Sequence, residues 1–142
     1  MPIVQGQTTL FKANILSGLE NFTLSSPYAY KIALYTANAN LNNTTTVYTS
    51  TNEATGGSYA AGGQVLSISN PPTQDTTNNT AFISFNNVTW TGNITARGAL
   101  VYNSTTGAAC FILNFGSDIT SSNTFTVTFP TATSTTAVLT IS

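Results

Sequence analysis

The chain has 142 residues, of which only 5% are charged, and a length of this size supports one domain, residues 1–142, with its own core. Its three basic residues, Lys12, Lys31 and Arg97, are too few and too scattered to hold a phosphate backbone, which excludes nucleic acid as an expected partner. No run approaches the roughly 20 apolar residues of a membrane span, and the first ten residues lack the pattern of a secretory signal.

The first pattern along the chain is helical. Phe11, Ile15, Leu19 and Phe22 recur at spacings of three or four residues, which predicts a short helix over residues 9–19. Thr8 or Thr9 is expected to cap its start, and Gly18 lies close to its end.

Residues 1–8 form a short segment ahead of this helix. It carries Pro2, Ile3 and Val4 without periodicity and is too short to fold alone. Two interpretations are open: a frayed terminus, or an N-terminal arm that docks on a neighbouring molecule. Under the second, these three residues are expected interface residues.

After the helix the hydrophobic period changes to two. YAYKIALYT places Tyr30, Ile32 and Leu34 on one face and Lys31, Ala33 and Tyr35 on the other, which predicts a strand. Similar strands are predicted in GGQVLSIS, AFISFNNVTW, RGALVYN, ACFILNF, TFTVTFP and AVLTIS, with VYTST as a weak candidate.

The predicted strands, about eight in number, indicate the expected fold class. Short strands rich in Thr, Val, Ile and aromatic residues, without helices between them, favour an all-β domain, an antiparallel β-sandwich or a jelly-roll-like fold. The segments TNEATGGSYAAGGQ and NPPTQDTTNNT are expected to be flexible loops that project at the rim.

The chain lacks the usual residues of catalysis. It contains no histidine, and its acids, Glu20, Glu53, Asp75 and Asp118, lie in four separate segments. Asp118 in FGSDITSSN is interpreted as a turn residue rather than a cation ligand. No metal or phosphate-binding motif is present. We therefore expect a protein that is not an enzyme and has no metal and no cofactor.

Aromatic residues leave one binding function open. A carbohydrate-binding module needs exposed rings, for which the candidates are Trp90, Tyr28, Tyr30, Tyr35, Tyr48, Tyr59 and Tyr102. Trp90 is expected to belong to the core rather than to a sugar platform. Cys110, in an apolar run, is likewise expected to be a buried small hydrophobe rather than a reactive thiol.

Arg97 is the only arginine and stands where a polar turn enters an apolar strand. One interpretation is a staple within the chain, with Asp118 as the first expected partner and Glu20 and Glu53 as rivals. The other is that its guanidinium reaches a neighbouring subunit, where an almost uncharged surface would make a single charged contact strongly directional.

The segment from Trp90 to Pro130, WTGNITARGALVYNSTTGAACFILNFGSDITSSNTFTVTFP, resembles small virion structural proteins of tailed bacteriophages. The resemblance rests on ARGALVYN, the hydrophobic strand after it, FGSD and TFTVTFP. The general layout of the remaining segments extends it over most of the chain. The resemblance implies a component of the virion, made in the host cytoplasm and present in many copies.

Among the roles in such particles, the resemblance favours a capsid decoration or cement protein that binds the major capsid protein. A homo-oligomer is implied, with a trimer as the expected state. The alternatives are a tail, baseplate or fibre-associated virion protein and, from another class, a carbohydrate-binding module.

Overall fold

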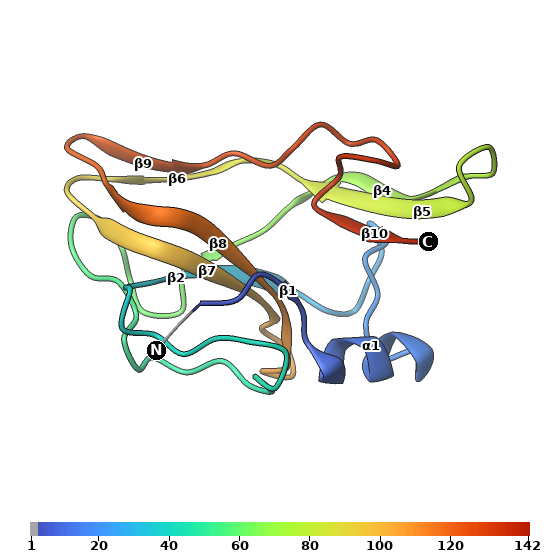
Figure 1. The fold of residues 1–142 in the computed structure, drawn as a ribbon, viewed down its shortest axis with the longest axis horizontal. Helices are drawn as coiled ribbons and strands as arrows, with labels where there is room; N and C mark the ends of the chain where they lie inside the picture. The colour runs from blue at the N-terminus through green and yellow to red at the C-terminus, as the bar shows by residue number, and fades with distance from the viewer. Residues whose placement is uncertain (1–2) are drawn as a thin grey trace.

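The computed structural model describes residues 3–142 and shows an all-β sandwich with one short helix, which confirms the expected fold class. One layer is a five-stranded sheet of order β1-β8-β7-β2-β3, and the second contains the sheets β10-β5-β4 and β6-β9 (Figure 1). All pairs of neighbouring strands are antiparallel. The bounds are β1 Gly6–Gln7, α1 Thr9–Leu16, β2 Tyr30–Tyr35, β3 Gln64–Val65, β4 Ile68–Asp75, β5 Thr80–Phe85, β6 Val88–Thr91, β7 Thr95–Asn103, β8 Ala109–Thr120, β9 Thr124–Val127 and β10 Leu139–Ile141.

The strand count differs from the expected eight for identifiable reasons. GGQVLSIS supplies β3 and the start of β4, and AFISFNNVTW contains both β5 and β6, because the chain changes partners within each segment. The arm contributes β1. VYTST forms only an isolated bridge, between Val47 and Ala108.

Helix α1 is shorter than the predicted range of 9–19. The Thr8 side chain caps its start by accepting the Phe11 N–H at 3.0 Å. The helix ends at Leu16 because Ser17 caps it and Gly18 turns the backbone to a φ of +74°. Phe11 is fully buried and its ring meets that of Phe111 in β8, so one aromatic side chain anchors the helix on the sheet.

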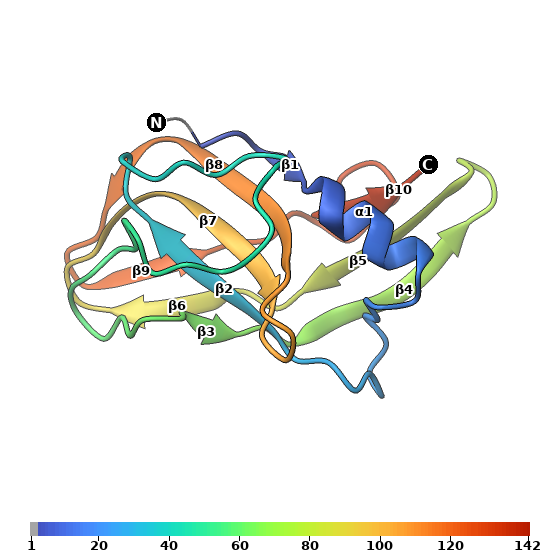
Figure 2. The same ribbon diagram turned by 90° about the horizontal axis from the view of Figure 1, so that it is seen from below.

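The core between the two layers is built from alternate strand residues. In β2, Tyr30, Ile32 and Leu34 face the main core, as the period of two predicts. Ala33 and Tyr35 face a second, smaller core on the opposite side of the same sheet. Residues from the segment after β2 and from the arm cover the central part of that side, so β2 and most of β7 are buried on both faces (Figure 2).

The two layers are joined at one end by adjacent turns, from β6 to β7 and from β8 to β9 (Figure 1). Ser121 holds these turns together: its hydroxyl donates to the Gly92 carbonyl at 2.7 Å and accepts the Ile94 N–H at 3.1 Å. The Gly92 N–H in turn donates to the Asn123 carbonyl. At the other end, the layers are bridged by the Gln7 side chain, which donates to the Thr140 carbonyl at 3.3 Å.

The two expected loops both make hydrogen bonds within the domain, and one of them, NPPTQDTTNNT, is largely strand and hairpin turn. NPPTQDTTNNT is most of the β4–β5 hairpin, whose register shifts accommodate the proline pair Pro71–Pro72. TNEATGGSYAAGGQ packs beside β6, where the Ser58 N–H donates to the Thr91 carbonyl at 2.8 Å. Loops were expected because these segments are rich in Pro, Asn and Gly. The same residues, however, also occur in β-bulges and where two backbones approach closely.

Candidate functional site

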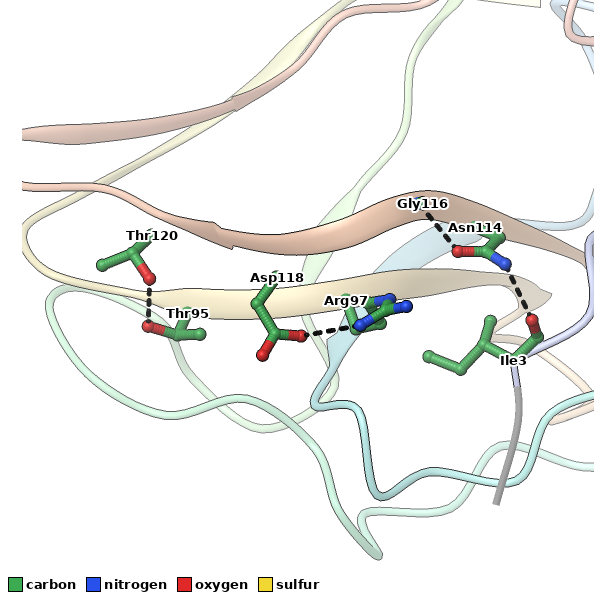
Figure 3. Close-up of polar contacts among 7 residues, drawn as sticks. All are labelled: Ile3, Thr95, Arg97, Asn114, Gly116, Asp118 and Thr120. Carbon is green, nitrogen blue, oxygen red and sulfur yellow. Dashed lines mark hydrogen bonds and ion pairs between the residues drawn. The ribbon is translucent and has the colours of Figure 1, made fainter.

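Arg97 and Asp118 form an ion pair between adjacent strands. The Arg97 Nη1 lies 3.4 Å from the Asp118 Oδ1, which confirms the expected partner (Figure 3). The two side chains are 39% and 56% exposed, so water screens the attraction and the pair is worth at most about 1 kcal/mol. Beside it, Thr95 and Thr120 share a hydrogen bond of 2.8 Å.

The arm lies next to this ion pair on its own chain. The Asn114 side chain donates to the Ile3 carbonyl at 2.9 Å, and the Asn114 N–H donates to the Gln5 side chain at 3.0 Å. Gly6 and Gln7 then pair with β8. A frayed terminus is therefore wrong for residues 3–7, and the contacts of this segment are with its own sheet. Pro2 lies outside the described residues.

Ile3 explains why glycine follows Arg97. Ile3 is buried, and a Cβ atom on Gly98 would lie 2.9 Å from its Cγ2 and 2.6 Å from the Leu113 carbonyl oxygen. The close approach of the arm and of β8 thus leaves no room for a side chain at this position. Val4, the next residue of the arm, is 50% exposed.

We call the surface formed by Thr95, Arg97, Asp118 and Thr120, beside the docked residue Ile3, the arm face (Figure 3). It offers one neutralised ion pair, hydroxyl groups and, in Ile3, an arm residue whose side chain is already buried. Chemically this is a surface for hydrogen bonds and shape complementarity. Of the expected interface residues, Ile3 and Arg97 are brought together here.

Glu20 holds the helix region against the sheet. Its Oε1 accepts from the Tyr30 hydroxyl at 3.0 Å and from the Asn103 amide at 2.9 Å, and its Oε2 accepts from Asn14 at 3.3 Å. Cys110 lies beside it, with Sγ 3.9 Å from Oε2. Burial, and secondarily the nearby Glu20 charge, raise the pKa of the Cys110 thiol. The expectation of a buried cysteine is confirmed.

Glu53 is held by two tyrosines of its own segment, the connection between β2 and β3. It accepts hydrogen bonds from the Tyr48 hydroxyl at 2.7 Å, from the Tyr59 hydroxyl, and from the Gly62 N–H at 2.8 Å. The Tyr59 oxygen in turn accepts the Leu34 N–H at 2.8 Å. Burial, together with the hydrogen bond to Glu53, raises the pKa of Tyr59. This cluster fixes the loop after β2 to the sheet.

Asp75 closes the β4–β5 hairpin. Its Oδ2 accepts from the Asn78 amide at 2.7 Å and the Ser134 hydroxyl at 2.6 Å, and these hydrogen bonds lower its pKa. The four carboxylates thus have four separate sets of partners. Within residues 3–142, no group of three or more His, Cys, Asp or Glu side chains is placed to hold a metal ion.

The aromatic side chains do not form a sugar platform. Trp90 is 2% exposed and packs against Tyr59 and Phe125, which confirms the expected core role. Every aromatic residue of the chain lies in the described part, and each is buried or half-buried.

An apolar cleft that sequence reasoning missed lies between α1 and the β10-β5-β4 sheet. It has a volume of about 370 Å³ and is lined mainly by Ile15, Phe22, Phe82, Ile83, Leu139 and Ile141. Leu16, on the neighbouring helix surface, is 90% exposed. No pattern in the sequence indicates this cleft, because it forms where the helix meets strands that are far away along the chain.

Comparisons with known proteins found no matching family, no matching curated protein and no matching solved structure. Across residues 3–142, no helix has the length and apolar character needed to span a membrane.

Proposed function

We propose that this chain is a non-enzymatic structural protein of a virion, and that it is a capsid decoration or cement protein that binds and stabilises the major capsid lattice. The observation that carries the proposal is the use of its few charged groups. All four carboxylates accept hydrogen bonds from their own chain, and the rest of the surface offers mainly hydroxyls, amides and backbone edges. Such a surface suits adhesion to a repeated protein lattice.

The arm face is the surface we assign to lattice binding. Its ion pair is exposed and weak within the chain, so Arg97 can exchange Asp118 for a carboxylate or a carbonyl of the capsid protein at little cost. The neighbouring threonine hydroxyls supply further hydrogen bonds. The chain would be made in the host cytoplasm, remain unbound until the shell is built, and act as a homo-oligomer.

A cryo-electron microscopy map of the particle that carries this chain tests the proposal. Repeated density over the capsid shell is the expected result, with the arm face directed at the capsid protein. Density confined to the tail, baseplate or fibres would replace decoration with the alternative virion role. Absence from the particle would overturn the virion proposal altogether.

A binding experiment tests the arm face itself. Purified protein is added to particles that lack it, and bound protein is measured after sedimentation. Arg97→Ala is expected to reduce binding, whereas Lys31→Ala removes the same charge from β2 and serves as the control. Equal binding by both variants would remove Arg97 from the interface. A carbohydrate-binding role is left without a platform by the burial of Trp90, and a glycan array with no bound sugar is expected.

A further inference from the structure

Strand β9 forms one edge of the β6-β9 sheet and is a regular strand with one neighbour. Its register with β6 is unbroken, from Val88 opposite Val127 to Thr91 opposite Thr124. The side chains alternate, with Phe125 and Val127 buried and Thr124 and Thr126 exposed. Whether this edge can pair with another strand depends on the direction of the N–H and C=O groups of Thr124 and Thr126.

The hydrogen bonds of β6 fix the direction of the backbone groups in β9. The Thr91 N–H donates to the Ser58 hydroxyl and its carbonyl accepts from the Ser58 N–H, so both groups point away from β9. In an antiparallel pair the direction alternates, so Trp90 exchanges hydrogen bonds with Phe125. It follows that the N–H and C=O groups of Thr124 and Thr126 point outward from the sheet. Within residues 3–142, they have no hydrogen-bond partner.

This edge lacks the features that protect the edge strand β4. Strand β4, also an edge, carries Pro71 and Pro72, which cannot donate, and two register shifts. Strand β9 has no proline, no charge and no bulge. An uncharged, regular edge with free backbone groups is a template for another strand.

We propose that β9 pairs with β9 of a second copy of this chain, antiparallel and across a two-fold axis at Phe125. In this register Thr124 lies opposite Thr126 of the second copy, and both residues present outward N–H and C=O groups, so each pair forms its two hydrogen bonds. The alternation of exposed and buried side chains continues across the new edge. Exposed threonines of one copy lie beside exposed threonines of the other, and the buried Phe125 lies beside Phe125 of the second copy. An edge that matches itself in this way fits an isologous dimer.

The charge distribution supports a second copy as the partner. Strand β9 contributes no charge, and the charged residue of β8 just before the turn into β9, Asp118, is neutralised by Arg97. Two copies therefore meet without like-charge repulsion along the paired edges. The proposal is independent of the virion function, because it concerns only the contact between copies.

The mass of the full chain in solution, measured by light scattering and sedimentation as a function of concentration, tests the proposal. A dimer that dissociates on dilution is expected. Thr126→Pro removes an outward N–H that no group of the monomer uses, together with the exposed hydrogen bond between the Thr126 and Thr89 hydroxyls, so it should lower the melting temperature only slightly while weakening the dimer at least about tenfold. Amide exchange at Thr124 and Thr126 should slow with rising concentration, whereas exchange at Phe125 should not change.

A second pair of variants keeps the test decisive if the proline variant misfolds. Thr124→Lys with Thr126→Lys places lysines directly opposite lysines across the two-fold axis and should yield a monomer. Thr89→Lys with Thr91→Lys adds the same charge to the same side of the sheet on β6 and should leave the dimer intact. A monomer at about 0.5 mM, or a trimer unaffected by either edge variant, would overturn the proposal. Loss of particle binding by edge variants of a purely monomeric protein would assign the edge to a capsid partner instead.

Discussion

Replacing Ile3 by alanine tests whether the arm belongs to the folded domain. Ile3 is 6% exposed, touches the backbone position of Gly98 and belongs to the smaller core with Tyr35 and Leu100. Removal of a buried isoleucine side chain costs about 2–5 kcal/mol, and a side chain in the smaller core belongs at the lower limit, about 2 kcal/mol. For a domain of this size, that loss lowers the melting temperature by about 4–8 °C.

The matched control is Val4→Ala, in the same arm but at a side chain that is 50% exposed. It should change the free energy of unfolding by less than about 0.5 kcal/mol. Both variants are melted by circular dichroism at one concentration. Equal melting temperatures for the two variants and the parent chain would refute the docked arm, and with it the reason given for glycine at position 98.

Three further outcomes are expected. Glu53→Gln places an amide donor against the donors of Tyr48 or Tyr59 and should destabilise the fold by about 2 kcal/mol in urea unfolding; an unchanged midpoint would contradict the structural role of this cluster. Arg97→Ala should cost less than about 1 kcal/mol in the same assay, and a larger loss would mean that the exposed ion pair is not the whole of its role. Burial raises the pKa values of Tyr35 and Tyr59 and of the Cys110 thiol above those of the unfolded chain, so the neutral groups stabilise the fold fully below about pH 8. This contribution is lost as the pH rises, first through Cys110 and above about pH 10 through the tyrosines. The melting temperature should therefore be flat from about pH 6 to 8 and fall at higher pH, and a flat profile to about pH 12 would be the contrary result.

Local pattern was sufficient where the decisive contacts are local or follow from alternation. The period of two in β2 assigned Ile32 and Leu34 to one side of the sheet and Ala33 and Tyr35 to the other, as the structure has them. Asp118 was predictable as the partner of Arg97 because the strands that carry them follow one another and pair as a hairpin.

Pattern failed where a distant segment decides the environment. Alternation does not reveal that the second face of β2 is also covered, because the cover comes from the arm and from the segment after β2. The partners of Glu20 include Asn103, which is 83 residues away. Pro71 and Pro72 suggested a loop, yet β4 accommodates them because it is an edge strand with register shifts.

The bridge between Gln7 and Thr140 also bears on how the domain folds. This contact joins residues 133 positions apart, and the hydrogen bond that holds the arm, from Asn114 to the Ile3 carbonyl, joins residues 111 positions apart. Neither can form while most of the chain is still being synthesised, and closing such long loops is slow. The nascent chain therefore exposes the strands β2 and β7 until β8 and β10 have been made, and we expect the sandwich to assemble only after residues 109–141 have emerged.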